Sequence, residues 1–276
     1  MASLARSDLP AGWAEVRILI TNDDGIRSPG LTVLEQIAAE ISNDVWVVAP
    51  EADCSDAFGA PTLSKPLKLH QLGSQRYSLA GTPADCVLVG IKHLLRSKLP
   101  SLLLAGVNAG ENLADDLFHS GTIAAAIQAT LLEMPSISLS LITRGKAQAK
   151  WHTPKKHGPD LLRTLLKRGW PDDVLLNVNF PDCEPAGLKG IAFTQQGRRP
   201  PTIWSVQHSK SECGRELCIQ RHKSRARTAT DLWAVETGRI SVTPIKVDLT
   251  AGILRRDSKE SRERKREGRG TKPVPN

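Results

Sequence analysis

The stretch Val16-Arg17-Ile18-Leu19-Ile20-Thr21-Asn22-Asp23-Asp24-Gly25 determines how the rest of the chain is interpreted. Its apolar residues, Val16 to Ile20, predict a buried strand that ends in two adjacent carboxylates, Asp23 and Asp24. Neighbouring like charges repel, and the end of a buried strand tolerates them mainly when a cation or one retained proton lowers the local field. The sequence therefore points first to a metal site, and a strand-end turn with exposed carboxylates is the alternative interpretation.

Length and composition limit the class of protein. A chain of 276 residues suits one large α/β domain, with or without an appended subdomain. No apolar run approaches the ~20 residues that span a bilayer, and residues 1–15 lack the apolar centre of a secretory signal. We expect a flexible leader there and a soluble, cytoplasmic protein with no membrane partner, organellar targeting being left open. The five scattered cysteines form no disulfide framework, so we expect reduced thiols.

The formal charge of +8 is concentrated at one end of the chain. Residues 255–272 hold nine basic and four acidic residues and so carry a net +5, and the remainder is nearly balanced. We expect residues 253–276 to be a basic, disordered tail. A nucleic-acid site on this tail is the alternative hypothesis, and it predicts binding that weakens steeply with salt.

Strand and helix alternate along residues 16–180. Ser28-Pro29 offers an N-cap and a first-turn proline, and Thr82 and Asp85 have the spacing of a capping box before a helix that starts at Pro83. The other predicted helices are 120–133 and 159–170, and the predicted strands are 16–20, 45–49, 77–80, 102–107, 136–142 and 174–180. We expect residues 16–190 to form a Rossmann-like catalytic core, an α/β fold with a doubly wound, mostly parallel sheet.

The pattern changes beyond Gly190. Residues 191–194, 217–220 and 240–247 resemble strands, and no helical periodicity lies between them. The connections are rich in Gly, Pro and Arg. We interpret residues 191–252 as a β-rich extension, a hairpin arm that packs on another subunit, with a returning strand.

Polar residues follow several of the predicted strands. Ligands of an open parallel sheet collect outside the carboxyl ends of its strands, which brings Asp23 and Asp24 together with Ser55 and Asn108. These residues offer carboxylate, hydroxyl and amide oxygens only. Such a set suits one hard divalent cation, Mg²⁺ or Mn²⁺, and argues against zinc or an iron–sulfur cluster.

A helix start lies near the same edge of the predicted sheet. Ser120, Gly121 and Thr122 bring two hydroxyls and a glycine to a helix N-terminus, where free N–H groups and the helix dipole favour an anion such as phosphate. Asn112, in the loop before it, is placed to donate to that anion. The chemistry indicated is metal-assisted hydrolysis of a phosphate ester.

The motifs also carry a family resemblance. In order, the chain has ITNDDGI-x-SPG at 20–30, VVAP at 47–50, GTPADCV at 81–87, GVNAGEN at 106–112, SGTIAAA at 120–126 and SVTPIKVDLT at 241–250. Over residues 16–251 it resembles the SurE (survival protein E) family of metal-dependent 5′/3′-nucleotidases, which act on nucleoside monophosphates. The basic tail lies outside this resemblance.

The resemblance implies specific roles. Asp23, Asp24, Ser55 and Asn108 would be the metal ligands, with one aspartate doubling as general acid or base. The phosphate would be held by Asn112, Ser120, Gly121 and Thr122. Family members are dimers or tetramers built with a C-terminal hairpin arm, so the resemblance implies a homodimer or homotetramer.

This chain departs from the family pattern at three positions. Asp56 replaces the glycine expected after the serine ligand, and its charge would repel a phosphate or recruit a second cation. Ala114 stands where glycine is expected and His119 where tyrosine is expected.

Other interpretations fit less well. A signalling receiver domain also carries an acidic pair after its first strand, but it needs an aspartate where this chain has Asn108. No G-x-G-x-x-G follows the first strand, which disfavours a dinucleotide-binding dehydrogenase. Zinc on His208, Cys213, Cys218 and His222 fits the usual ligand spacing poorly. Asp231 is interpreted as a buried structural carboxylate.

Overall fold

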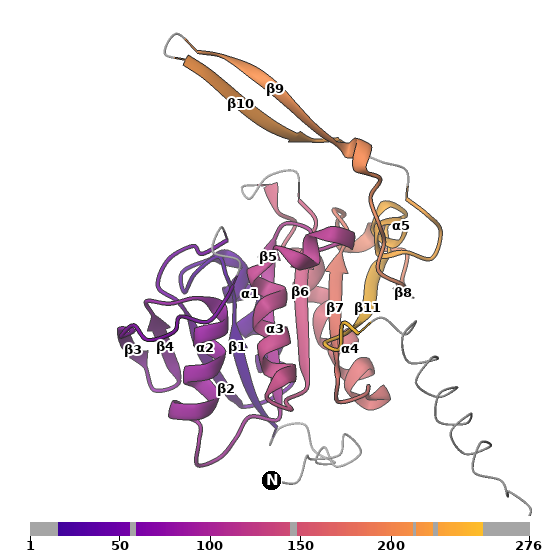
Figure 1. Cartoon of the computed structure of the whole chain (residues 1–276). Coiled ribbons are helices and arrows are strands. Elements are labelled where there is room, and N and C mark those ends of the chain that lie inside the picture. Colours follow the sequence, from indigo (N-terminus) through magenta and orange to yellow (C-terminus); the bar gives the residue numbers. More distant parts are fainter. Residues whose placement is uncertain (1–15, 56–58, 144–147, 212–213, 223–225, 251–276) are drawn as a thin grey trace, which may run out of the picture.

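The computed structural model describes residues 16–55, 59–143, 148–211, 214–222 and 226–250, with the backbone alone for 208–211 and 214–216. A nine-stranded sheet in the order β3-β4-β2-β1-β5-β6-β7-β11-β8 forms its centre (Figure 1). Its strands are β1 (Arg17–Thr21), β2 (Asp44–Pro50), β3 (Leu69–Gly73), β4 (Arg76–Leu79), β5 (Leu102–Ala109), β6 (Ser136–Leu141), β7 (Val174–Phe180), β8 (Ile191–Phe193) and β11 (Ile240–Lys246). Six neighbouring strands of this sheet run parallel, in the order β4, β2, β1, β5, β6 and β7. The predicted doubly wound α/β fold is therefore confirmed.

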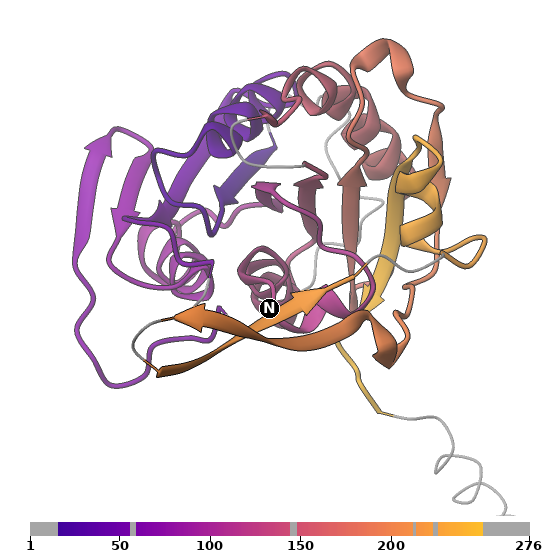
Figure 2. The same ribbon diagram turned by 90° about the horizontal axis from the view of Figure 1, so that it is seen from above.

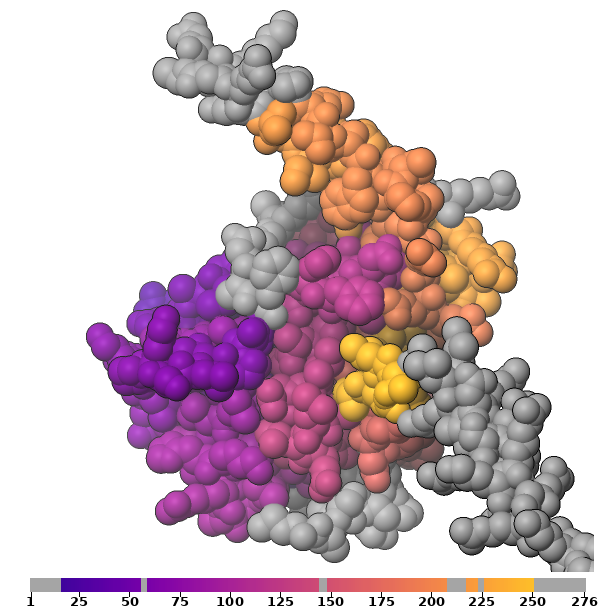
Figure 3. All heavy atoms as spheres, viewed as in Figure 1, coloured from indigo at the N-terminus to yellow at the C-terminus, as the bar shows by residue number. Residues whose placement is uncertain are grey.

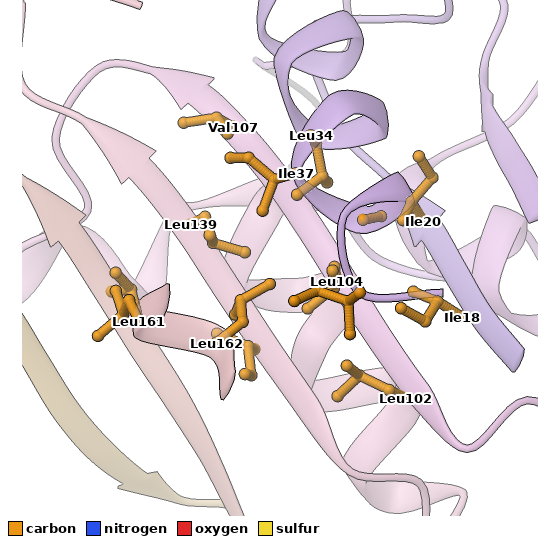
Figure 4. Packing of buried hydrophobic residues seen from close by; sticks show 14 of the residues in the cluster. Ile18, Ile20, Leu34, Ile37, Leu102, Leu104, Val107, Leu139, Leu161 and Leu162 are labelled. Carbon is orange, nitrogen blue, oxygen red and sulfur yellow. The ribbon is translucent and has the colours of Figure 1, made fainter. Parts of the chain in front are cut away.

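Helices α1 (Pro29–Ala39) and α4 (His152–Arg168) cover one face of the sheet. The apolar side chains of β1 and β5 alternate between the two faces, as a pleated strand requires. On the α1 side, Ile18, Ile20, Leu102 and Leu104 are fully buried and pack with residues of the two helices (Figure 4). Ser28 caps α1 by accepting the N–H of Leu31 at 3.3 Å.

Helices α2 (Pro83–Val89) and α3 (Gly121–Leu131) cover the opposite face, so the sheet has helices on both sides (Figure 2). The capping box predicted for α2 is confirmed: Thr82 Oγ1 accepts the N–H of Asp85, and Asp85 Oδ2 accepts the N–H of Thr82. A π-helical turn, η3 (Gly90–Leu94), prolongs α2. The 3₁₀ turn η4 (Ala114–Phe118) precedes α3.

The order of the strands reverses between β1 and β5. The chain runs outward from β1 through β2 on one side and continues from β5 through β6 and β7 on the other. The loops after β1 and β5 therefore diverge and open a crevice at the carboxyl ends of these strands, where open α/β sheets bind their ligands. Asp23, Asp24 and Asn108 lie at this point.

The C-terminal part adds strands to the sheet and a separate hairpin. β11 pairs antiparallel with β7 and parallel with β8, while α5 (Asp231–Glu236) packs on β11. A 3₁₀ turn, η6 (Pro185–Gly187), precedes β8, and a second, η7 (Pro201–Ile203), follows it. The chain then forms an antiparallel two-stranded ribbon, β9 (Trp204–Ser211) and β10 (Gly214–Arg221), before it reaches α5. The ribbon projects from the body (Figures 1 and 3), which confirms the predicted hairpin extension.

Some predicted boundaries are wrong. The helix predicted at 159–170 starts at His152 and keeps Pro159 inside it. The prediction treated that proline as a first-turn residue, but the buried face of the helix begins earlier, at Thr153, and Gly158 lies against Ile37 of α1. The sequence also did not indicate β3, β9 or the short helix α5. No helix in the described ranges is long and apolar enough to cross a membrane.

Several predictions fall outside the described residues. These are the leader at 1–15, the departure at Asp56, and the basic tail at 253–276 with its nucleic-acid hypothesis. Cys213 of the zinc alternative also lies outside them, and the His208 side chain is not described.

Candidate functional site

A cavity of about 890 Å³ opens at the crevice between the loops that follow β1 and β5. Its lining brings together all four residues predicted as metal ligands, Asp23, Asp24, Ser55 and Asn108, and two of those predicted to hold phosphate, Asn112 and Ser120. The remaining lining residues are Asp53, Cys54, Ala109, Glu111, Asp116, His119 and Arg221. The convergence predicted from strand order is therefore present in one cavity.

The turn after β1 is fixed by backbone conformation and by one buried amide. Gly25 has φ +94°, a conformation that L side chains rarely adopt, and a Cβ there would lie 2.9 Å from the carbonyl carbon of Ala52. Asn22 is fully buried and donates to Gly25 O at 3.0 Å and to Ser28 Oγ at 2.7 Å. This turn directs Asp23 and Asp24 into the cavity.

Asp23 is held by the start of α3. Its side chain accepts the hydroxyl of Thr122 at 2.6 Å and the backbone N–H of Thr122 at 3.2 Å. The pKa of Asp23 is raised to about 6, mainly by burial; the bond from the Thr122 hydroxyl lowers this pKa, and the nearby Asp24 carboxylate adds to its rise. Burial and the neighbouring Asp24 carboxylate therefore disfavour the charged form of Asp23, and a bound cation would stabilise that form.

Gly121 allows the start of α3 to lie close to Asp23 in the loop after β1. A Cβ at this position would lie 2.9 Å from Asp23 Cβ and 3.1 Å from Asp23 Oδ2. Gly121 and Thr122 do not line the cavity; the structure places them behind Asp23. Ser120 lines the cavity and caps α3, since its hydroxyl accepts the N–H of Ile123 at 3.1 Å. In the part of the chain that is described, the N–H of Gly121 has no hydrogen-bond partner.

Asp24 and Asn108 meet across the β1–β5 junction. Asp24 Oδ2 accepts the N–H of Ala109 at 3.2 Å. The pairing of β5 with β6 shifts between Ala105 and Asn108, and Gly106, with φ +134°, lies in this bulge. The Asn108 amide nitrogen donates to Gly110 O at 3.2 Å, which leaves the amide oxygen as the group available to a cation.

Ser55 arrives from the loop after β2. A hydrogen bond from the N–H of Cys54 to Asp23 O at 2.8 Å connects this loop to the loop after β1. The Ser55 hydroxyl donates to Asp53 Oδ1 at 2.5 Å, so its lone pairs remain available as acceptors. The sequence did not single out Asp53 as a contact of the predicted ligand Ser55.

The donor set fits a hard divalent cation. Carboxylate, hydroxyl and amide oxygens are the ligands that Mg²⁺ and Mn²⁺ prefer. Among the residues that the structure describes, no three His, Cys, Asp or Glu side chains are grouped so that they could hold a metal. A metal in this cavity would therefore depend on the oxygens of Ser55 and Asn108 as well as on the two aspartates.

Two arginines form ion pairs with Glu111 and Asp116, two of the carboxylates that line the cavity. Arg199 is buried and donates to Glu111 at 3.0 Å and to Asp116 at 2.9 Å, and Arg221 of β10 contacts the same two carboxylates at 2.5 Å each. No sequence signal pointed to this network, because its partners are 83 to 110 residues apart. The hairpin thus contributes a side chain to the cavity.

The departures at Ala114 and His119 lie close to the cavity. Ala114 has φ +51°, a left-handed conformation that favours the glycine of the family pattern. His119 lines the cavity at its rim.

Asp231 is fully buried and accepts the N–H groups of Ala114, Gly197 and Leu232 at 2.7–2.8 Å, and burial raises its pKa. Its interpretation as a buried structural carboxylate agrees with these contacts.

Comparison with known proteins gives a consistent family. The family model described as "Survival protein SurE" matches residues 18–202. A "5'-nucleotidase SurE" of Parvibaculum lavamentivorans is 44% identical over 245 residues, 87% of this chain and 88% of that protein. One of Azorhizobium caulinodans is 45% identical over 85% of this chain and 94% of that protein. The crystal structure of the SurE protein from Aquifex aeolicus is similar, with a TM-score of 0.80 and 33% identity over 89% of this chain and 99% of that chain.

Proposed function

Because the chain belongs to the SurE family, we propose that it is a divalent-metal-dependent phosphomonoesterase that hydrolyses nucleoside 5′-monophosphates to nucleoside and phosphate. The observation that carries this proposal is the meeting of Asp23, Asp24, Ser55 and Asn108 in one cavity beside the start of α3. Relatives that are 44–45% identical to this chain over 85–87% of its length bear the name 5′-nucleotidase.

The metal would be Mg²⁺ or Mn²⁺, held by the oxygens of Asp23, Asp24, Ser55 and Asn108. When bound, such an ion polarises a phosphoryl oxygen, neutralises developing negative charge and lowers the pKa of a bound water. One cation per chain fits the single set of donors in this cavity.

Groups of the cavity wall and of the adjoining start of α3 would bind and orient the phosphate. The N–H of Gly121 is unused among the described residues, and at a helix N-terminus it favours an anion. Asn112 is buried at the cavity wall and offers amide hydrogens. One carboxylate of the Asp23–Asp24 pair would exchange a proton with the attacking water or the leaving oxygen, as general acid–base catalysis requires.

We extend the proposal to nucleoside 3′-monophosphates. The cavity of about 890 Å³ is at the large end of small-molecule sites, so it has room for a nucleotide in more than one orientation. Its lining is dominated by carboxylates and amides rather than by an enclosing apolar slot.

The test is phosphate release from a panel of purine and pyrimidine 5′- and 3′-monophosphates, with Mg²⁺, Mn²⁺ or EDTA. We expect turnover with metal, none with EDTA, and loss of activity in Asp23→Asn without unfolding. Asp160→Asn, on the exposed face of α4, is the matched control and should keep full activity. Full activity of Asp23→Asn would refute the assignment of the site.

We also propose that the hairpin joins two copies of the chain into a homodimer, which can pair further into a homotetramer. Trp204, Val206, Leu217 and Ile219 are 56–73% exposed, and the β9–β10 register places them on one face of the ribbon. An apolar strip of this kind on a projecting ribbon is typical of an assembly surface. Light scattering should give a multiple of the 30.0 kDa chain mass, and Ile219→Glu should shift it toward that mass. A monomeric wild-type protein would contradict this.

A further inference from the structure

Strand β7 carries two fully buried asparagines, Asn177 and Asn179, on one face of the sheet. Pairing with β6 places Ser138 opposite Asn177 and Ser140 opposite Asn179. Because residues two apart in a strand point to the same face, these side chains form a polar block inside the sheet. None of them lines the cavity.

The asparagines of this block form hydrogen bonds with both the N–H and the carbonyl oxygen of Asn112. Asn179 Oδ1 accepts the N–H of Asn112 at 3.0 Å, while the amide nitrogens of Asn177 and Asn179 donate to the Asn112 carbonyl oxygen at 2.8 and 3.0 Å. The Asn112 side-chain amide donates to Ser140 Oγ at 2.8 Å. A bond from Ser138 Oγ to Asn177 Oδ1 at 3.0 Å fixes the orientation of Asn177.

A second buried polar cluster in the same sheet shows what a purely structural arrangement looks like. Thr194, Ser241 and Thr243 are buried, and their hydroxyls lie 2.8–3.3 Å from one another. These side chains satisfy their own hydrogen bonds and do not line the cavity. The asparagine block differs because its bonds end on a residue of the cavity wall.

We infer that Asn177 and Asn179 are positioning residues for the hydrolysis: they act through Asn112, holding its peptide so that its side-chain amide is fixed beside the phosphate. This inference rests on the proposed function. Ser140 takes one hydrogen of the Asn112 amide, and the second has no partner among the described residues. It is therefore the hydrogen that reaches a phosphate oxygen.

Loss of this grip should affect catalysis more than folding. Bonds to both the N–H and the C=O of Asn112 determine where the loop between β5 and η4 lies over the sheet. A displacement of about 1 Å in a substrate-binding group can reduce the rate about 100-fold. We therefore expect kcat/KM to fall by about 10- to 100-fold when Asn179 is removed.

The experiment compares Asn179→Leu with Thr243→Val, which removes a similarly buried polar group from the second cluster. Both variants should lower the melting temperature, but only Asn179→Leu should lower kcat/KM for AMP by tenfold or more. The double variant Asn112→Ala with Asn179→Leu should be no less active than Asn112→Ala alone. Equal activity losses in the two single variants, or additive losses in the double variant, would overturn the inference.

A second measurement does not depend on activity and uses the milder change Asn177→Ser. Amide hydrogen exchange across residues 110–113 should speed up by tenfold or more, while exchange in β7 stays slow. Unchanged exchange at 110–113 would also overturn the inference. A wild-type enzyme that releases no phosphate from any nucleotide refutes the proposed function and this inference together, whereas an active wild type with an equally active Asn179→Leu refutes this inference alone.

Discussion

Replacing Gly121 by alanine perturbs the contact between α3 and the acidic pair with a single methyl group. The added Cβ would lie 2.9 Å from Asp23 Cβ, whereas carbon atoms in ordinary contact are roughly 3.5–4.0 Å apart. The helix start and the Asp23 side chain must therefore separate by roughly 0.6–1.1 Å. Since a 1 Å misplacement costs about 100-fold, we expect kcat/KM to fall by about 30- to 100-fold, or about 2–2.7 kcal/mol of transition-state stabilisation.

The assay is steady-state phosphate release from AMP at saturating Mn²⁺, together with calorimetric titration of Mn²⁺. At saturating Mn²⁺ the fall should appear mainly in kcat, and the titration should separately show weaker Mn²⁺ binding, because Asp23 is proposed to serve both catalysis and metal binding. Overpacking typically costs about 1–3 kcal/mol, so circular dichroism should still show a folded protein. Gly187→Ala makes the same change at an exposed glycine, where the added Cβ would lie an ordinary 3.5 Å from Cys183 Cβ, and this variant should behave as wild type. A Gly121→Ala enzyme within threefold of wild type would refute the steric argument.

Three further changes test other parts of the site. Asp231→Asn turns an acceptor of buried N–H groups into a donor, so urea unfolding should show a loss of about 1–3 kcal/mol, and an unchanged midpoint would contradict that. Ala114→Gly relieves a left-handed alanine at φ +51° and should raise stability by about 0.5–1 kcal/mol; a lower urea midpoint would refute the strain. Arg221→Met should hardly change the melting temperature, since partly exposed ion pairs contribute about 0–1 kcal/mol, but it leaves Glu111 and Asp116 less compensated in the cavity. KM for AMP should then rise several-fold at low salt, and a KM unaffected at any ionic strength would count against this role.

The sequence predicted the parts of the fold that depend on local patterns. Ser28 and the Thr82–Asp85 box marked helix starts because capping uses side chains within three residues of the exposed N–H groups. The convergence of Asp23, Asp24 and Asn108 also followed, since parallel strands bring their carboxyl ends to one edge. The start of α4 was missed because the tertiary packing of Gly158 on Ile37 outweighs the local signal of a proline.

Long-range partners could not be predicted in the same way. Arg199 and Arg221 reach Glu111 and Asp116 from segments far along the chain, and no periodicity or spacing encodes that meeting. Thr122 was predicted beside the phosphate from its helix position, but only coordinates show that its hydroxyl and N–H are both bonded to Asp23. Asn177 and Asn179 lie in a strand that was correctly predicted, yet nothing local showed which loop they hold.

The central claim is that Asp23, Asp24, Ser55 and Asn108 share one divalent cation at the carboxyl edge of the sheet. Anomalous scattering from crystals of the wild-type protein grown with Mn²⁺ tests it most directly. The account predicts one strong peak per chain, in coordination contact with oxygens of these residues and beside the start of α3. A peak elsewhere in the molecule, or an empty cavity at a Mn²⁺ concentration that supports turnover, would contradict it.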